Sequence, residues 1–171
     1  EQIKLIEGSA DAIKLLNKKF KVIIVTNQPA VARGLCTEKQ LEKIHKKLKL
    51  LLAEKKAKVD AIYYCPHHPE KHHKDIKPQF RKYRIGCDCR KPKTGMLKKA
   101  QKKFKLDIKK CFIIGDKTID IQTGKNAGCK TFLVKTGYGG KDKEFDIAPD
   151  FIFKNLYETA KFIVVKQSNQ K

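Results

Sequence analysis

The sequence predicts an α/β protein in which a parallel sheet carries helices on both faces. Short apolar runs of strand length alternate along the chain with segments whose apolar residues recur at helical spacing. Several of these runs are continuously apolar, which is typical of parallel strands that are covered on both faces. Polar residues directly follow three of the strands, so a ligand site is expected at the carboxyl edge of the sheet.

In the first part of the chain, helix and strand signals alternate regularly. Ser9 is the expected N-cap of a helix over 10–20, and the apolar run that follows predicts a buried strand over 21–26. A polar loop then leads to Thr37-Glu-Lys-Gln40, a capping box that opens a long helix with an apolar stripe. A second short strand is expected over 61–64.

The alternation resumes in the second part of the chain. The expected elements are a helix over 96–104, a strand over 111–114, a helix over 118–127, a strand over 130–134, a strand over 151–153 and a helix over 156–164. Gly128 is a suitable C′ residue for the helix before it, because glycine adopts the left-handed conformation without a steric cost.

The chain of 171 residues is expected to form one domain over 1–165 with a polar tail over 166–171. Residues 65–95 interrupt the periodic pattern with cysteine, histidine, proline and basic residues. Loops of this length inside a domain are usually functional or held by a ligand. We expect the part over 65–89 to be an inserted metal-binding loop.

The charge of the chain is strongly positive, with 40 Lys and Arg residues, 18 Asp and Glu residues and a net charge of +22. Nucleic-acid binding is one interpretation of such an excess. However, only four of the 40 residues are arginine, the preferred bidentate reader of phosphates and bases, and the lysines are spread along the chain. The pattern favours a lysine-rich surface that attracts anionic substrates, with no nucleic-acid partner.

A reducing cytoplasm is the expected location. No signal-peptide pattern opens the chain, and its longest apolar run is too short to span a bilayer, so no membrane partner is expected. Clustered cysteine and histidine residues indicate metal binding rather than disulfides in this setting. The other cysteines, Cys36, Cys111 and Cys129, are not expected to be ligands. Position 1 is not methionine, which favours a sequence cut from a longer chain.

Two short hooks, Cys65-Pro66-His67 and Cys87-Asp88-Cys89, supply four nitrogen and sulfur ligands. Four such ligands suit tetrahedral Zn²⁺ in a structural site. Metal binding would order a loop that has few apolar residues of its own. His68, His72 and His73 remain alternative ligands, although the close spacing of the first hook favours His67.

A second group of residues suits a phosphate and Mg²⁺. Thr26 ends a strand, Lys91 directly follows the second hook, and Asp116 ends another strand. A hydroxyl and a lysine ammonium can hold phosphate oxygens, and a carboxylate at a strand end suits Mg²⁺. Each residue also has an ordinary structural interpretation: Thr26 as a cap, Lys91 as surface charge and Asp116 as an N-cap. Their placement after strands of one sheet favours a common site.

Four segments carry a family resemblance: IIVTNQPAVARG over 23–34, YYCPHHPE over 63–70, CDCRKPKTGML over 87–97 and FIIGDKTIDIQTGKNAG over 112–128. They resemble the haloacid dehalogenase (HAD) superfamily of phosphatases, and within it the zinc-containing D-glycero-D-manno-heptose-1,7-bisphosphate phosphatases. The related histidinol-phosphate phosphatases are the alternative. The resemblance implies a Rossmann-like fold and Mg²⁺-dependent phosphoryl transfer through an aspartyl-phosphate, with a small phosphorylated sugar as substrate. For the oligomeric state, a monomer is the default expectation.

The resemblance also implies roles for individual residues. Thr26 and Lys91 would steady the phosphoryl group, and Asp116 would bind Mg²⁺. Substrate contacts are implied for Asn27, Gln28, Pro29, Arg90 and Lys117, and zinc ligation for Cys65, His67, Cys87 and Cys89. Pro29 is a departure, because the family has serine there and proline removes both a hydroxyl and an N–H donor.

A larger departure concerns the nucleophile. The family opens with a strand that ends in D-x-D and supplies the nucleophile and the general acid/base, but no D-x-D occurs in these 171 residues. The central first strand of the sheet is therefore expected to be missing. Asp116 is expected to hold the metal, and Asp120 to point elsewhere. The chain as given is predicted to be inactive; the alternative is a non-catalytic, zinc-stabilised binding module.

Overall fold

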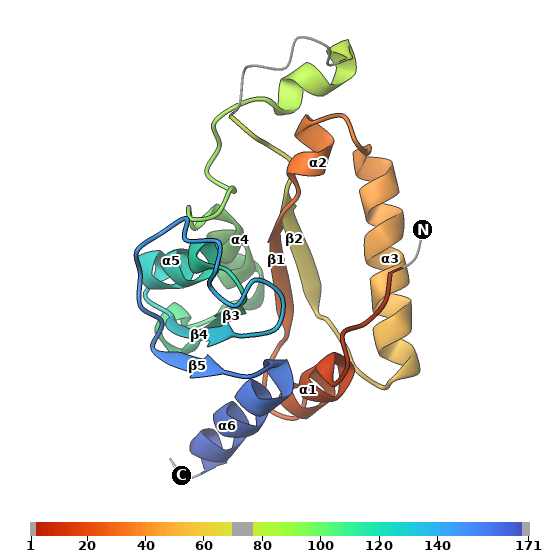
Figure 1. Ribbon diagram of the computed structural model, residues 1–171. Coiled ribbons are helices and arrows are strands. Elements are labelled where there is room, and N and C mark those ends of the chain that lie inside the picture. Colours follow the sequence, from red (N-terminus) through yellow and green to blue (C-terminus); the bar gives the residue numbers. More distant parts are fainter. Residues whose placement is uncertain (1–2, 70–76, 169–171) are drawn as a thin grey trace.

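The computed structural model describes residues 3–69 and 77–168, in which helices and parallel strands alternate (Figure 1). The helices are α1 (Ser9–Leu16), α2 (Pro29–Ala32), α3 (Glu38–Glu54), α4 (Gly95–Phe104), α5 (Thr118–Ala127) and α6 (Leu156–Ser168), with short 3₁₀ helices η1 (Pro78–Tyr83) and η2 (Ile108–Lys110). The strands are β1 (Ile23–Asn27), β2 (Ala61–Cys65), β3 (Phe112–Gly115), β4 (Lys130–Val134) and β5 (Phe151–Phe153). The α/β prediction is confirmed.

Local signals were interpreted correctly in most places. Gln40 and Thr37 form the predicted capping box, in which the Thr37 hydroxyl accepts from the Gln40 N–H at 3.2 Å. Helix α5 and strands β4 and β5 have the predicted bounds. The cap of α1 was predicted wrongly: Gly8 is the N-cap, with φ 72°, and the Ser9 hydroxyl donates to the Ile6 carbonyl instead.

Several elements differ from the sequence prediction. Helix α1 ends at Leu16 rather than at residue 20, β1 spans Ile23–Asn27 rather than 21–26, and the short helix η2 was not predicted. The polar loop after β1 contains the short helix α2, and the long interruption over 65–95 contains η1. Helix α6 continues to Ser168, into the segment expected to be a polar tail. Proline begins both α2 and η1, a position where its missing N–H costs nothing.

The strands form two separate parallel sheets. One has the order β1-β2, with Asn27 opposite Cys65, and the other has the order β3-β4-β5. Within the described residues no strand pairs with the outer edge of β1 or of β3. Strands β1 and β3 are therefore edge strands of their sheets, as β2 and β5 are at the opposite edges.

Backbone hydrogen bonds show which residues point to these open edges. In β1, the Gln28 N–H bonds to the Cys65 carbonyl, so even-numbered residues face β2 and Val25 faces the open edge. In β3, the Cys111 carbonyl accepts from Lys130, so Ile114 faces the open edge. Their backbone groups have no strand partner in the described part of the chain.

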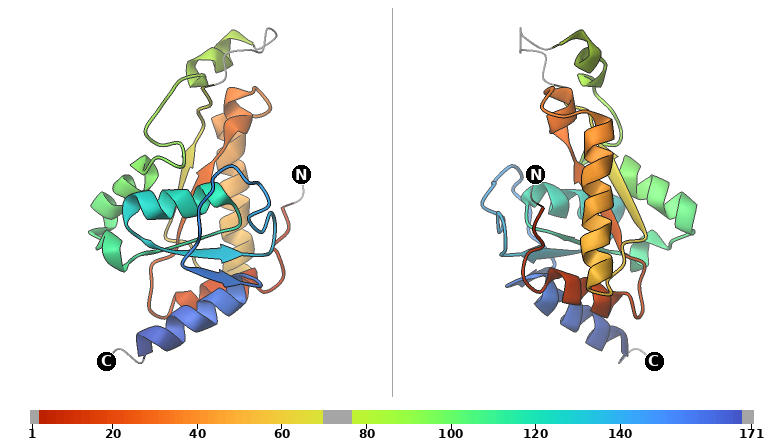
Figure 2. Two further views of the ribbon diagram at one scale, coloured as in Figure 1. Left: turned by 60° about the vertical axis from the view of Figure 1, so that its left-hand side comes forward. Right: turned by 90° about the vertical axis from the view of Figure 1, so that its right-hand side faces the viewer.

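Helix α1 ties the two sheets together. Its residues Ala10 and Ile13 pack with Leu52 of α3 and with partly buried β1 and β2 side chains, whereas Ala12 and Leu16 pack with Phe132 of β4 and with α6. Figure 2 shows α1 beside α6 at one end of the molecule and α3 lying along the β1-β2 sheet. Helix α4 contacts β1 and β2, and α5 contacts β3 and β4. Within the described residues, no helix is long and apolar enough to span a bilayer.

Candidate phosphate and metal sites

Asn27 and Lys91 are locked together although 64 positions separate them. The Asn27 Oδ1 accepts from the Lys91 backbone N–H at 3.0 Å, and the Asn27 Nδ2 donates to the Lys91 carbonyl at 3.2 Å. Asn27 is the last residue of β1, and Lys91 lies in the loop before α4. This paired contact fixes the backbone of Lys91 at the carboxyl end of the β1-β2 sheet.

The Lys91 ammonium reaches from one sheet to the other. It donates to the Val25 carbonyl at 3.2 Å, on the open edge of β1, and pairs with the Asp120 Oδ1 at 2.5 Å. Both side chains are only 12% exposed, so the pair is well shielded from water. The carboxyl ends of β1 and β3 therefore meet around one lysine.

Asp120 was not recognised as a site residue, and the prediction that it points elsewhere is wrong. It lies in the first turn of α5, where its Oδ2 accepts from the Lys117 N–H at 3.2 Å and its Oδ1 faces Lys91. Gly115 leaves room for it, because a Cβ there would collide with the Asp120 side chain. The available signal was an acidic residue in the first turn of a predicted helix, where its side chain can accept from the N-cap N–H.

Thr26, Gln28 and Pro29 surround the same strand end. The Gln28 Nε2 donates to the Thr26 hydroxyl at 3.3 Å, and the Gln28 N–H donates to the Cys65 carbonyl at 2.8 Å. Pro29 starts α2 directly afterwards. The structure thus brings together Thr26, Gln28 and Pro29 with the Asn27–Lys91 contact.

Asp116 is held by the glycine-rich turn after β4. Its Oδ2 accepts from the Tyr138 N–H at 2.8 Å, and its carbonyl accepts from the Gly140 N–H at 2.8 Å. Gly137 has a φ of 73°, and a Cβ on it would collide with the Asp116 carboxylate. Within the described residues the Oδ1 has no hydrogen-bond partner. The Lys117 Nζ lies 3.7 Å from the centroid of the Tyr138 ring.

The two predicted hooks meet in space. Cys65, His67, Cys87 and Cys89 have ligand atoms that all lie within 4.8 Å of one another. The three sulfur atoms are 3.1–3.5 Å apart, and the His67 Nδ1 is 3.4 Å from the Cys89 Sγ. A tetrahedron with Zn–S bonds of about 2.3 Å places sulfur atoms about 3.8 Å apart, so small shifts would complete the site. The chemistry of the donor set therefore fits zinc.

Backbone groups in and next to the first hook accept hydrogen bonds from residues around it and donate hydrogen bonds to them. The Arg90 Nη1 donates to the His67 carbonyl at 3.2 Å, which links a predicted substrate residue to the hook. Cys65 is fully buried, and burial raises the pKa of its thiol. The His68 N–H donates to the Tyr83 carbonyl, and His72 and His73 lie outside the described residues.

The other cysteines lie elsewhere. The Cys111 thiol contacts the Asp107 carbonyl and the buried Cys129 thiol contacts the Ile108 carbonyl, both beside η2. Cys36 follows α2 and is half-buried.

A pocket of about 190 Å³ lies between the second hook and the loop that follows β4. Its charged lining residues are Arg90, Lys91, Lys93 and Glu144. Three cations beside one carboxylate suit an anionic ligand that also carries hydroxyl groups.

Comparison with known proteins agrees with this arrangement. A family model described as HAD-hydrolase-like matches residues 88–159. The D-glycero-D-manno-heptose-1,7-bisphosphate 7-phosphatase of Chlorobaculum tepidum is 32% identical over 179 residues, covering 100% of this chain and 86% of that protein. The corresponding Escherichia coli K12 protein, named for the β anomer, is 35% identical over 170 residues, covering 98% and 84%.

Solved structures show the same likeness. The D,D-heptose 1,7-bisphosphate phosphatase of B. bronchiseptica, complexed with magnesium and phosphate, superposes with a TM-score of 0.79 and 30% identity, covering 94% of this chain and 84% of that one. By this identity and coverage, the chain belongs to the D-glycero-D-manno-heptose-1,7-bisphosphate phosphatase family of the haloacid dehalogenase superfamily.

Proposed function

We propose that the chain is the phosphate- and metal-binding part of a Mg²⁺-dependent phosphatase that removes the 7-phosphate of D-glycero-D-manno-heptose 1,7-bisphosphate. One observation carries the proposal: Lys91, fixed by Asn27, bridges the carboxyl ends of both sheets next to Asp120. Relatives that are 32–40% identical bear the name of this activity, which supports the choice of substrate.

In this proposal the residues around Lys91 bind the transferred phosphoryl group. The Lys91 ammonium and the Thr26 hydroxyl neutralise and hold its oxygens, as preorganised donors do for a developing negative charge. Asp120 keeps the ammonium in place until a phosphate competes for it. Asn27 positions Lys91, and Gln28 positions the Thr26 hydroxyl.

The rest of the sugar occupies the cationic pocket. Arg90 and Lys117 bind the substrate from two sides, the first beside the zinc loop and the second beside Tyr138. Pro29 shapes the wall after β1 without donating a hydrogen bond.

Asp116 is the residue of this chain that would bind Mg²⁺. Its donor chemistry fits, because the Tyr138 N–H occupies one carboxylate oxygen and the other oxygen has no hydrogen-bond partner among the described residues. Mg²⁺ takes few protein carboxylates and keeps water and phosphate oxygens, so one carboxylate here is an adequate share. When bound, the ion supplies charge neutralisation at the phosphoryl group.

Zn²⁺ would be held by Cys65, His67, Cys87 and Cys89 as a structural ion. Four protein ligands leave no open position for a reacting group, so zinc orders the loop rather than taking part in chemistry. The ordered loop then presents Arg90 and Lys91 to the substrate.

The nucleophilic carboxylate is proposed to come from a D-x-D strand outside this sequence. The open edges of β1 and β3 support this proposal, since one parallel strand between them would join the two sheets and end beside Lys91. Without such a strand the chain should lack turnover, because no described carboxylate is left to act as the nucleophile at a central strand end. Asp116 is assigned to Mg²⁺, and Asp120 is paired with Lys91. We place the complete enzyme in the cytoplasm, as a monomer that binds neither nucleic acid nor membranes.

The test compares the 171-residue chain with a version extended upstream through a D-x-D strand. We expect Mg²⁺-dependent release of phosphate from the heptose bisphosphate by the extended protein alone. Asp116→Ala should remove most of this turnover, and Lys91→Ala should lower it by about 10²–10³-fold. Equal turnover by both chain lengths would contradict the assigned nucleophile, and a preference for histidinol phosphate would move the substrate to the neighbouring family.

A further inference from the structure

Glu38 accepts hydrogen bonds from two tyrosines that come from different parts of the chain. Its Oε1 accepts from the Tyr64 hydroxyl at 3.1 Å, and its Oε2 accepts from the Tyr83 hydroxyl at 2.6 Å. Glu38 begins α3, whereas Tyr64 lies near the end of β2 and Tyr83 ends η1. One carboxylate therefore joins three elements, and the role proposed above does not use it.

Each tyrosine is next to the first hook, Tyr64 in the sequence and Tyr83 in space. Tyr64 immediately precedes Cys65 in β2. The Tyr83 ring lies 6.2 Å from the His67 ring, centroid to centroid, and the Tyr83 carbonyl accepts from the His68 N–H at 3.0 Å. Tyr83 is also only four residues before Cys87, so its position affects the second hook.

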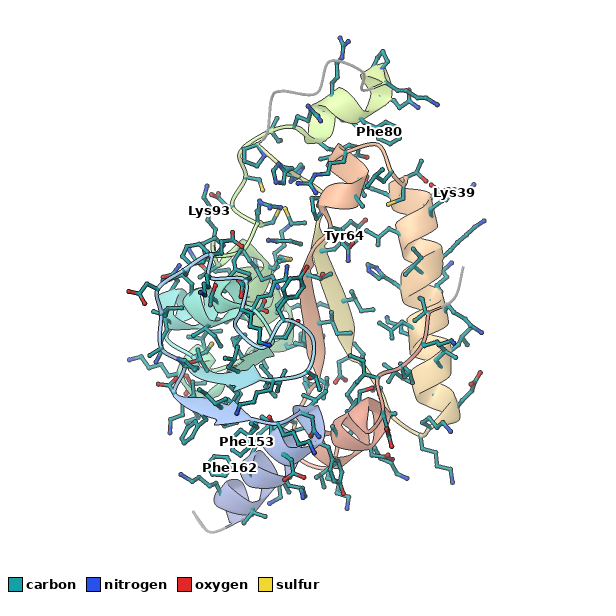
Figure 3. The ribbon with its side chains drawn as sticks, viewed as in Figure 1. Lys39, Tyr64, Phe80, Lys93, Phe153 and Phe162 are labelled. Atoms are coloured by element: carbon teal, nitrogen blue, oxygen red, sulfur yellow. The ribbon has the colours of Figure 1, made fainter. Side chains whose placement is uncertain are left out.

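Further contacts seat η1 on the same corner of the molecule. Phe80 is buried, and it lies against Gly34 after α2. The Arg84 Nε donates to the Ala32 carbonyl at 3.3 Å. Figure 3 shows Phe80 above α2 and Tyr64 beside the upper end of α3. Residues 80–84 are thus anchored at a surface that includes Glu38.

The charge of Glu38 suits this place. A carboxylate in the first turn of a helix is stabilised by the helix dipole. The bond to Glu38 raises the pKa of Tyr83 to about 12, and burial followed by the bond to Glu38 raises the pKa of Tyr64 to about 12. A tyrosine hydroxyl is protonated at neutral pH even with its ordinary pKa of about 10, so both phenols act there as hydrogen-bond donors to Glu38.

We propose that Glu38 is a positioning residue for the zinc ligands: through Tyr64 and Tyr83 it holds the two hooks at metal-binding distance and thereby controls how tightly zinc is retained. This inference rests on the proposed zinc site and is independent of the proposed phosphatase activity. Partners that orient metal ligands typically change metal affinity by about 10–100-fold when removed.

The experiment measures transfer of zinc from the loaded 171-residue chain to a chromogenic chelator. Glu38→Ala should lower zinc affinity by about 10–100-fold, and Glu38→Gln, which keeps the size but can accept fewer bonds, should have an intermediate effect. Tyr83→Phe should weaken retention more than Tyr64→Phe, because its bond is shorter. Adding Tyr83→Phe to Glu38→Ala should cause little further loss.

Glu42→Ala is the matched control, since Glu42 is an exposed carboxylate one turn further along α3. It should retain zinc within about twofold of the unchanged chain. The absorption spectrum of the cobalt-loaded chain gives a second measurement, because altered ligand positions change its bands while a distant loss of stability does not.

The outcomes separate this inference from the site on which it rests. Failure of the unchanged chain to bind zinc would reject the zinc site, and the inference with it. Tight zinc binding that is the same in Glu38→Ala and the unchanged chain would reject the role of Glu38 alone. Equal losses of zinc affinity in Glu38→Ala and Glu42→Ala would show that the loss of a negative charge on α3, rather than of the bonds to the tyrosines, causes the effect. That result would also overturn the inference.

Discussion

Strands β1 and β4 have the same length but different surroundings. Four of the five β4 residues are buried, from Thr131 to Val134, whereas every residue of β1 is partly exposed although it begins Ile-Ile-Val. Strand β4 is paired on both edges, and β1 is paired on one. Pairing, rather than apolar content, therefore decides how deeply a strand is buried in this molecule.

The contacts between the two sheets also differ from one end of β1 and β3 to the other. At the start of β3, Phe112 packs edge-on against Phe20, which precedes β1, with ring centroids 5.8 Å apart. Apolar contact therefore joins the two sheets at this end. At the carboxyl end, the contact is polar and depends on Lys91 between Val25 and Asp120. The β1-β2 sheet and the β3-β4-β5 sheet are thus joined by apolar contacts at one end and by the polar contacts of the candidate site at the other.

The largest expected effect distinguishes the two strands by mutation. Phe132→Ala in β4 should destabilise the protein by about 3–5 kcal/mol, because Phe132 is 1% exposed and contacts several aromatic rings. Val25→Ala in β1 should cost about 1 kcal/mol, since its side chain is already partly in water. Denaturant unfolding measures both, and equal costs would contradict the comparison.

A strand paired with the outer edge of β1 should reduce the difference in amide protection between β1 and β4. In the extended protein, amide exchange at Val25 should slow by about 100-fold relative to the 171-residue chain, because its N–H would gain a partner. Phe132 is already paired on both sides and should change little. Hydrogen exchange followed by NMR tests this, and strong protection of Val25 in the shorter chain would show that its edge is already covered.

Removal of zinc should increase amide exchange in the metal-binding loop more than in strand β4. Chelation should speed amide exchange at His68 and Gly95 by about tenfold, because their bonds to Tyr83 and Asp88 lie on the loop that the metal orders. The amide of Phe132 serves as the internal control. Equal acceleration at all three amides would mean that zinc supports the whole fold rather than the loop.

The smallest effect lies at the start of β4. Asp150 accepts from the Thr131 N–H and hydroxyl, each at 2.7 Å, and pairs with Lys125 at 2.5 Å. The bond to Lys125, and then those to Thr131, lower the pKa of Asp150 to about 2. Asp150→Asn should cost about 1 kcal/mol, a value kept small because the side chain is partly exposed.

This contribution has a defined dependence on pH. Because the folded pKa lies below the unfolded value of about 3.9, the stabilisation is complete above pH 4 and is lost as the pH falls towards 2. The difference in stability between the unchanged chain and Asp150→Asn should therefore be constant near neutrality and shrink between pH 4 and 2. A difference that grows on acidification would assign the pKa shift to another group.

Local sequence was enough to predict the elements whose hydrogen bonds close within one turn. The capping box of Thr37 and Gln40 and the stop of α5 at Gly128 depend on neighbouring residues. Strand β4 was also predicted from its own residues, although its hydrogen bonds go to β3 and β5. The two zinc hooks were also visible, because each pair of ligands is separated by one residue. Family resemblance added the expected roles of Thr26, Lys91 and Asp116 and the expectation of a D-x-D motif, which does not occur in these 171 residues.

Tertiary packing decided the contacts between residues that are far apart in sequence. Asn27 meets Lys91, Lys91 meets Asp120, and Glu38 meets Tyr83 only because helices and strands bring their ends together. No periodic pattern encodes such a pair, since the distance between the partners depends on every element between them. For the same reason, composition suggested that β1 would be buried, whereas its residues are partly exposed and its outer edge has no paired strand among the described residues.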